Sequence, residues 1–298
     1  LYNIDDGLNA NFINDLTVDN YENIWLATNM GLKKFDGYNF VNYEIPNYNR
    51  REIKKVFFQD QLLYILYKGG ILLQLNLKNG VFKKFTNDYI LDFFITPQET
   101  YLLKGNFNIE IIKKRKKINY VLKFSKKLPV QDSENYYGIV SYKNSIYFSI
   151  PKMGLFRLKK NKLINLSTYY DDTPGGVRER FKIINHNLFF IGLPRPLLIE
   201  NNAKPVNFID RHNLRITDFT IKNNIKYYIR ENNTLIYEQN KKSTIIIKQL
   251  KNIELRKLYF IGENIFIVSN KGLFKINFKF YKPNACYFLN YSKSINIR

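Results

Sequence analysis

The chain has little of the side-chain chemistry on which many enzymes depend. Among 298 residues there is one cysteine, Cys286, and there are two histidines, His186 and His212. A single cysteine excludes an intrachain disulfide and a cysteine-rich metal site. Two histidines in unrelated segments leave little for a zinc site, and no nucleotide loop, nucleophile elbow or metal-binding histidine pair is visible. We therefore expect no metal, no cofactor and no catalytic activity.

Long apolar runs are also absent. Hydrophobic residues make up 45% of the chain, but they come in short runs broken by Asn, Lys, Gly and Asp. None approaches the roughly 18 apolar residues that a membrane helix needs. No signal peptide is visible, and because the sequence begins at Leu1, this says nothing of a removed leader. We expect no membrane segment in these residues.

Acidic residues are scarce relative to basic ones. The chain has 25 Asp and Glu against 47 Lys and Arg, a formal charge of +22. Only 12 of these cations are Arg, and Lys, Asn, Ile, Tyr and Phe share A/T-rich codons. A genome rich in A and T can therefore produce the positive charge without selection for an anionic partner. The alternative is that the charge forms a functional positive face. We expect no nucleic-acid partner, and the only dense basic run, Lys113–Lys117, falls where a hairpin turn is expected.

What the chain does contain is a repeat with two coupled features. A short apolar segment recurs at intervals of 39, 38, 46, 42, 38 and 38 residues, and an aromatic residue precedes each segment by six or seven positions. The segments begin at Gly31, Gly70, Asn108, Gly154, Pro196, Thr234 and Gly272, and their aromatic partners are Trp25, Tyr64, Tyr101, Tyr147, Phe189, Tyr227 and Phe266.

Each repeat unit is predicted to contain four strands. In the first unit these are 12–19, 23–28, 31–35 and 39–44, with Asn, Asp and Gly in the turns between them. A period near 40 residues with four strands per repeat is typical of a β-propeller. The sequence thus predicts an all-β fold, a seven-bladed β-propeller with four-stranded antiparallel blades.

The last unit has three clear strands, 255–261, 264–269 and 272–277, and an ambiguous fourth. Either Leu1–Ile4 or Phe278–Tyr281 can complete it, and we favour the N-terminal segment because it would join the two ends of the ring. The propeller is assigned to residues 1–281. Residues 282–298 are assigned as a linker or the first strand of a following β-sandwich.

The first repeat unit closely resembles the two-component-regulator propeller family. It contains Asp6-Gly7-Leu8, then Asp19 with Ile24-Trp25-Leu26-Ala27-Thr28, then Gly31-Leu32-Lys33-Lys34-Phe35-Asp36-Gly37, and finally Phe40 and Tyr43. Asn23 stands where the family usually has glycine. The later units keep the aromatic residue and the apolar segment but not the full family motif, since Trp25 is the sole tryptophan.

A second, short match extends this resemblance. Residues 282–289, KPNACYFL, are similar to the start of the tyrosine-motif β-sandwich that follows such propellers. The resemblance implies the periplasmic sensor region of a bacterial, Bacteroidetes-like signalling protein. It also implies downstream sensor domains in the same polypeptide, and a full-length protein that can dimerise.

The seven repeat aromatics could form a sugar-stacking ring, but their shared position in the second strand favours packing between blades. Ligand chemistry in propellers lies on loops, because the strands build the scaffold. Arginine is the scarcer cation and can grip carboxylate or sulfate with two parallel hydrogen bonds. The candidate ligand-binding residues are Arg50, Arg51, Tyr169, Tyr170, Arg178, Arg180, Arg195, Arg211, His212 and Arg230.

The resemblance and the missing catalytic groups favour a ligand-sensing domain that binds a glycan or another polar or anionic ligand at a propeller face. The alternative is a protein-interaction scaffold without a small-molecule ligand. A hydrolase or lyase would need convergent acids or a His–Glu pair, and His212 with Glu231 is the only remote candidate. The adjacent Asp171 and Asp172 are not expected to form a paired-carboxylate site, because neighbouring loop residues point apart, and Asp19–Asn23 is expected to be a hairpin turn and not a calcium loop.

Overall fold

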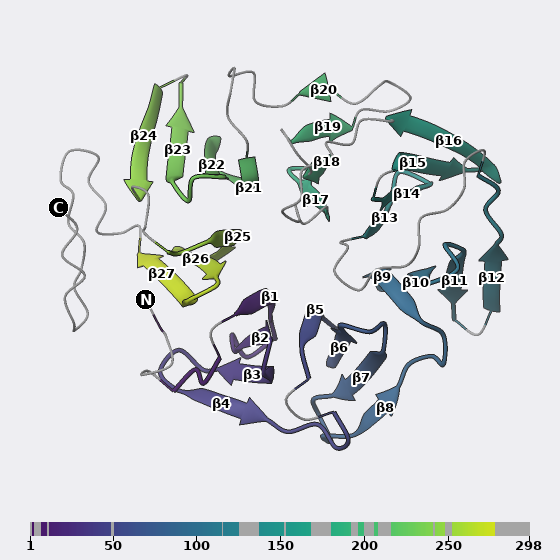
Figure 1. The fold of residues 1–298 in the computed structure, drawn as a ribbon, viewed down its shortest axis with the longest axis horizontal. Helices are drawn as coiled ribbons and strands as arrows, with labels where there is room; N and C mark the ends of the chain where they lie inside the picture. The colour runs from purple at the N-terminus through teal and green to yellow at the C-terminus, as the bar shows by residue number, and fades with distance from the viewer. Residues whose placement is uncertain are drawn as a thin grey trace.

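A computed structural model shows a ring of antiparallel sheets (Figure 1). It describes residues 2, 7–10, 12–48, 51–114, 116–124, 137–151, 153–167, 180–191, 196–199, 206–207, 216–240, 242–247 and 252–277. Six sheets have four strands in chain order, and the seventh has three. The fold is the predicted seven-bladed propeller. No helix among the described residues is long and apolar enough to cross a membrane.

The first four blades follow one another around the ring, each running from an inner to an outer strand (Figure 1). Their strands are β1 (Ile13–Val18), β2 (Ile24–Thr28), β3 (Gly31–Phe35) and β4 (Phe40–Tyr43); β5 (Ile53–Gln59), β6 (Leu62–Tyr67), β7 (Leu72–Asn76) and β8 (Phe82–Lys84); β9 (Ile90–Ile95), β10 (Glu99–Lys104), β11 (Ile109–Lys113) and β12 (Lys116–Tyr120); and β13 (Gly138–Tyr142), β14 (Ser145–Ile150), β15 (Gly154–Lys159) and β16 (Lys162–Ser167).

Blades five to seven complete the ring. Their strands are β17 (Arg180–Ile184), β18 (Asn187–Ile191), β19 (Leu197–Ile199) and β20 (Val206–Asn207); β21 (Ile216–Lys222), β22 (Ile225–Arg230), β23 (Leu235–Gln239) and β24 (Lys242–Ile247); and β25 (Leu255–Ile261), β26 (Asn264–Ser269) and β27 (Gly272–Asn277).

The tight hairpins explain part of the abundance of asparagine. In five of them both central residues have positive φ, the conformation of a type I′ turn, which matches the twist of the flanking strands and favours Asn. These pairs are Asp60-Gln61, Lys143-Asn144, Lys160-Asn161, Asn185-His186 and Asn223-Asn224.

The apolar core is divided into seven clusters, each lying between two neighbouring blades. Each cluster contains one of the seven repeat aromatics, and none of these side chains is more than 6% exposed. Trp25 packs toward blade two and donates its indole N–H to Asp19 at 2.9 Å. These rings therefore hold adjacent blades together and do not form an exposed surface for stacking sugars.

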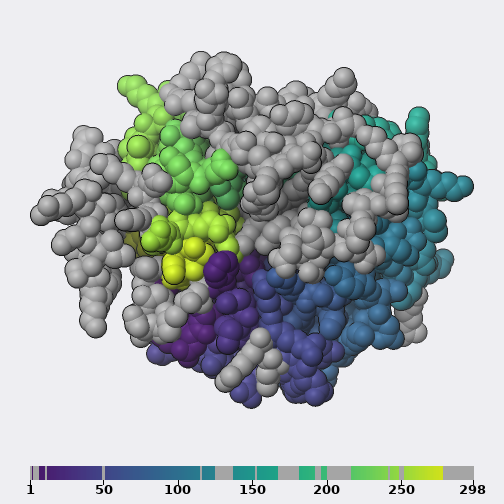
Figure 2. Space-filling model, viewed as in Figure 1, coloured from purple at the N-terminus to yellow at the C-terminus, as the bar shows by residue number. Residues whose placement is uncertain are grey.

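The ring closes where the first blade meets the last. The backbone N–H of Tyr2 donates to the Leu273 carbonyl at 2.7 Å, and the N–H of Leu273 donates back at 2.9 Å. Tyr2 thus pairs with the free edge of β27, as expected for closure by the N-terminal segment. Phe278–Tyr281, the other candidate, lies outside the described residues. In the space-filling view the purple first blade lies against the yellow last blade (Figure 2).

Candidate functional site at the start of the inner strands

The inner strands begin at one side of the ring, where the blade-to-blade connections meet the turns between second and third strands. We call this side the connection face. In four blades the first residue of that turn donates its backbone N–H to the carbonyl of the residue just before the inner strand. The pairs are Asn29 to Phe12 (3.0 Å), Lys68 to Glu52 (3.0 Å), Gly105 to Tyr89 (2.7 Å) and Asn270 to Glu254 (3.2 Å).

A β-bulge follows directly in five of the inner strands. The register of pairing shifts at Ile13/Asp15 in β1, and equivalent shifts occur in β5, β9, β21 and β25. A bulge adds an unpaired residue and re-aims its side chain. The added residues are Asn14, Lys54, Leu91, Thr217 and Arg256.

Two of these bulge residues meet across the junction of blades seven, one and two. The Arg256 guanidinium, 4% exposed, donates to Glu254 at 3.0 Å and to the Asn14 amide oxygen at 3.4 Å. Its carbon Cζ lies 4.2 Å from the centre of the Phe12 ring, within the range of a cation–π contact. Asn14 in turn donates to Glu52 at 3.1 Å.

We call Phe12, Asn14, Glu52, Lys68, Glu254 and Arg256 the mouth cluster. Lys68 completes it, since its ammonium lies 3.3 Å from the second Glu52 oxygen. Phe12 is 38% exposed and covers a buried guanidinium, while the Lys68 and Glu52 side chains are 32% and 35% exposed. An accessible aromatic ring flanked by carboxylates and an ammonium can bind a hydroxyl-rich ligand by stacking and hydrogen bonding.

Below the mouth cluster, three buried carboxylates bind the inner strands to one another. We call Asp15, Asp92 and Asp218 the axial carboxylates. Each accepts an ammonium from the preceding blade and a backbone N–H from the following blade. The ammonium contacts are Lys257 to Asp15 (2.6 Å), Lys55 to Asp92 (2.7 Å) and Lys182 to Asp218 (2.8 Å), and the amide contacts come from Val56 (3.3 Å), Ile139 (3.0 Å) and Leu258 (2.7 Å).

These contacts argue for a structural role of the axial carboxylates. Blade four has Gly138 at the equivalent position, where a Cβ would lie 3.1 Å from the Phe181 ring. Among the described residues there is no group of three or more His, Cys, Asp or Glu side chains that could hold a metal ion. Of the three, Asp15 ties together β25, β1 and β5, the strands beside the mouth cluster.

Only part of the predicted ligand site falls on described residues. Arg51 is exposed and its guanidinium lies 5.4 Å from the centre of the Tyr48 ring. Tyr48 lies 5.4 Å from the buried Tyr67, where burial raises the pKa of the phenol. Arg230 ends β22 on the connection face, and its carbonyl accepts from Asn233 at 2.9 Å.

Arg180 begins β17, and its backbone pairs with Ile191. The described candidates thus come from three places in the ring: Arg51 precedes blade two, Arg180 lies in blade five and Arg230 in blade six. The remaining candidates lie outside the described residues: Arg50, Tyr169, Tyr170, Arg178, Arg195, Arg211 and His212.

The mouth cluster was not identified from the sequence. A usable signal exists, because a polar residue directly follows the buried Ile or Leu that begins an inner strand, as in Ile13-Asn14 and Leu255-Arg256. The contact between Asn14 and Arg256 joins residues 242 positions apart. Only ring closure brings them together.

No model of a protein family and no curated protein matches the sequence. Solved structures match it as a fold. Virginiamycin B lyase from Staphylococcus aureus gives a TM-score of 0.66 at 14% identity, over 92% of this chain and 96% of that chain. YCF48 from Cyanidioschyzon merolae gives 0.63 at 10% identity, over 91% and 96%.

A third match is the extracellular domain of BT4673 from B. thetaiotaomicron, described as a hybrid two component system. It gives a TM-score of 0.69 at 18% identity, over 90% of this chain but 38% of that chain, so this chain spans less than two fifths of its length. At such identities the likeness shows the fold alone. The family suggested by the first blade stays a prediction, and the chain is a seven-bladed propeller of a shape found in lyases and in extracellular sensor domains.

Proposed function

We propose that this propeller is the extracytoplasmic recognition domain of a two-component-type signalling protein, and that it binds a glycan fragment at the mouth cluster. The observation that carries the proposal is the conjunction of Phe12, Arg256 and Glu52 on the connection face. The first-blade motif and the fold shared with extracellular sensor domains support the signalling context.

The geometry of the mouth cluster suits a sugar. Phe12 offers an apolar face, and sugars present C–H groups on one face of the ring. Glu52, which Asn14 and Lys68 hold in place, supplies acceptor oxygens for hydroxyl groups, and Arg256 is held by Glu254 and Asn14. A site whose side chains are already ordered loses less conformational entropy when a ligand binds.

The test has two steps. A panel of oligosaccharides is first screened for compounds that raise the unfolding temperature of the protein, and the affinity of these compounds is then measured by titration calorimetry. Phe12→Ala should weaken binding at least tenfold, because it removes the stacking surface while leaving the strands intact. Tyr38→Ala is the matched control, since Tyr38 is 88% exposed in the β3–β4 turn on the opposite side. Equal affinity in the two variants, or no saturable ligand in the panel, would overturn the proposal.

The proposed extracytoplasmic location is tested separately. In intact cells the propeller of the full-length protein should be cleaved by added protease once the outer permeability barrier is opened. Protection until the cytoplasmic membrane is broken would contradict an extracytoplasmic location.

A protein-interaction scaffold is the second candidate. It is favoured by apolar side chains exposed around the outer strands: Val41 is 52% exposed, Val81 55% and Val121 73%. A propeller with a comparable fold, YCF48, has been solved bound to a D1 peptide. Polypeptide binding that survives Phe12→Ala and is lost on Val41→Lys would favour the scaffold.

A further inference from the structure

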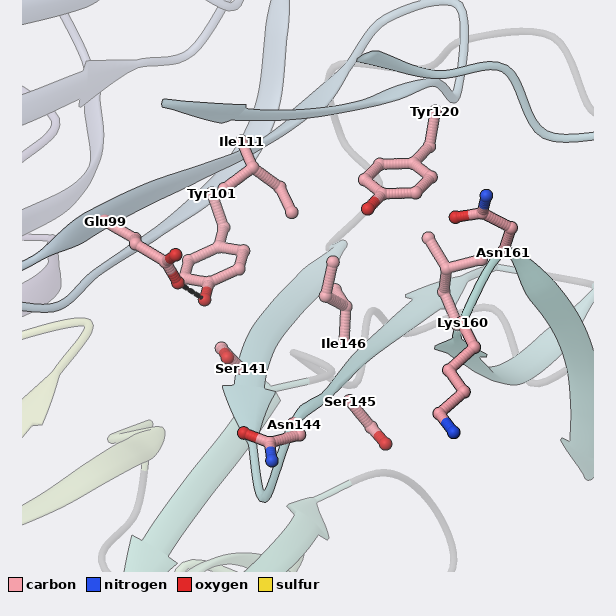
Figure 3. Close-up of a pocket in the computed structure, with 11 residues that line it drawn as sticks. Glu99, Tyr101, Ile111, Tyr120, Ser141, Asn144, Ser145, Ile146, Lys160 and Asn161 are labelled. Carbon is pink, nitrogen blue, oxygen red and sulfur yellow. Dashed lines mark hydrogen bonds between the residues drawn. The ribbon is translucent and has the colours of Figure 1, made fainter. Parts of the chain in front are cut away.

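A second polar site lies between blades three and four. It is a pocket of about 200 Å³, and no residue of the mouth cluster lines it (Figure 3). Blade three contributes residues from β10, β11 and β12, and blade four contributes its two hairpin turns and the strands beside them. The lining residues are Glu99, Tyr101, Ile111, Tyr120, Ser141, Asn144, Ser145, Ile146, Leu158, Lys160 and Asn161.

One wall of the pocket is formed by the Glu99 carboxylate and the Tyr101 hydroxyl that donates to it. The Tyr101 hydroxyl donates to Glu99 (Figure 3), and the Lys113 ammonium lies 3.1 Å from the other Glu99 oxygen. The Tyr101 hydrogen bond holds the pKa of Glu99 below its usual value. Burial, with the Glu99 hydrogen bond, raises the pKa of Tyr101 to about 12. At neutral pH the pocket therefore presents an ionised carboxylate beside a protonated phenol.

The other walls combine an apolar base with further hydrogen-bonding groups. Ile111, Ile146 and Leu158 are all buried. Beside them Figure 3 shows the Tyr120 hydroxyl from blade three and the Asn161 amide from blade four. Alternating hydroxyls and amides over an apolar base suit a small molecule with many hydroxyl groups on a compact ring.

The volume limits the size of the occupant. Pockets for drug-sized ligands measure about 300–1,000 Å³. At about 200 Å³ this pocket is smaller, so it suits a single ring and not a whole oligosaccharide.

The surroundings of the pocket are strongly basic. Three of the four hairpin turns of blades three and four on this side carry exposed lysines, and the acids that face them, Glu99 and Glu110, are already in ion pairs. The excess of positive charge favours an anionic ligand. The lysines are Lys113, Lys114, Lys116 and Lys117 at the β11–β12 turn, Lys143 at the β13–β14 turn, and Lys160 and Lys162 at the β15–β16 turn.

We propose that this pocket between blades three and four binds an acidic monosaccharide unit, a sugar ring that carries a carboxylate or a sulfate. Glu99, Tyr120 and Asn161 bind the hydroxyl groups, the Ile146 and Leu158 side chains contact the C–H face, and Lys160 attracts the acid group. The site is separate from the mouth cluster and stands whether or not the mouth cluster binds a glycan.

The experiment is a calorimetric titration of the purified chain with glucuronate, glucose 6-sulfate and glucose at low ionic strength. At least one acidic sugar should bind saturably and at least tenfold more tightly than glucose. Preference between the first two sugars identifies the acid group. Tyr120→Phe and Lys160→Asn should each weaken acidic-sugar binding at least fivefold, and Asn suits the positive φ of 46° at position 160.

One control separates this site from general attraction to anions. Lys78→Asn removes the same charge from the β7–β8 turn of blade two and should leave affinity unchanged. Combining Tyr120→Phe or Lys160→Asn with Phe12→Ala keeps the two sites apart, because the fivefold losses should persist when the mouth cluster is already altered. No saturable binding by either acidic sugar, or equal losses in Lys78→Asn and Lys160→Asn, would overturn the proposal.

Discussion

At the scale of single residues, short polar side chains fix the turns on which the blades depend. Asp19, 7% exposed, is the most connected of them. One carboxylate oxygen accepts the backbone N–H groups of Tyr21 at 2.9 Å and Asn23 at 3.0 Å. The other accepts the Trp25 indole N–H at 2.9 Å. These contacts confirm the predicted hairpin turn between β1 and β2 at residues 19–23.

Asp19→Ala should lower the free energy of unfolding by about 2–3 kcal/mol, because it leaves the buried indole and two turn amides without their acceptor. Urea unfolding followed by the fluorescence of the sole tryptophan measures this loss directly. Asp36→Ala is the control, since Asp36 caps the exposed β3–β4 turn through Tyr38 and Asn39. A loss in Asp19→Ala no greater than in Asp36→Ala would contradict the role given to Asp19.

At the scale of elements, three inner strands carry buried carboxylates that join neighbouring blades. The axial carboxylates are nearly inaccessible, and Asp218 is 0% exposed. A buried carboxylate is tolerated only when its oxygens are satisfied, and Asp218 accepts from Lys182, Phe219 and Leu258. Each axial carboxylate therefore contacts three consecutive blades and sets the spacing of their inner strands.

Asp218→Ala should lower the free energy of unfolding by about 3–5 kcal/mol, because Lys182 would stay partly buried without the Asp218 carboxylate. Asp88→Ala breaks an ion pair of similar length, 2.9 Å to Lys104, in which the Asp88 side chain is 45% exposed. That control should cost less than about 1 kcal/mol, as exposed pairs do. Chemical denaturation of the two variants side by side gives the comparison. Similar losses of unfolding free energy would show that the axial carboxylates stabilise the fold no more than an exposed ion pair does.

At the scale of the whole molecule, stability depends on closing the ring. The cluster between blades seven and one includes Leu8, Phe35 and Phe266, and the Tyr2 ring packs 5.0 Å from Phe35. Without closure, the edge of β27 would lose its partner and this cluster would face solvent on one side.

Tyr2→Pro should lower the free energy of unfolding by about 2–4 kcal/mol, since proline removes both the N–H donor to Leu273 and the ring against Phe35. Tyr2→Phe keeps the backbone bonds and the ring and should unfold close to the wild type. Differential scanning calorimetry of the two variants is the measurement. A Tyr2→Pro protein as stable as Tyr2→Phe would mean that this pairing does not close the ring.

Much of the architecture could be predicted because it is local and repeated. The strands 255–261, 264–269 and 272–277 were predicted with the bounds that the structure gives, and the first-blade strands differ by at most one residue at each end. The aromatic-plus-apolar pattern recurs in every unit, so seven weak signals reinforce one another. The sites could not be predicted in the same way. Candidate arginines were chosen one loop at a time, and only Arg51 and Arg230 have described side chains.

The sequence by itself determined the strand order, the number of blades and the aromatic residue in each blade interface. These follow from short-range periodicity, which repeats within about 40 residues. Only the tertiary structure decided which polar residues meet. Arg256 and Asn14 lie 242 positions apart, and the polar pocket joins Glu99 to Asn161 across two blades. The reason is geometric: β-bulges and blade packing set where these side chains point, and ring closure brings the first and last inner strands together.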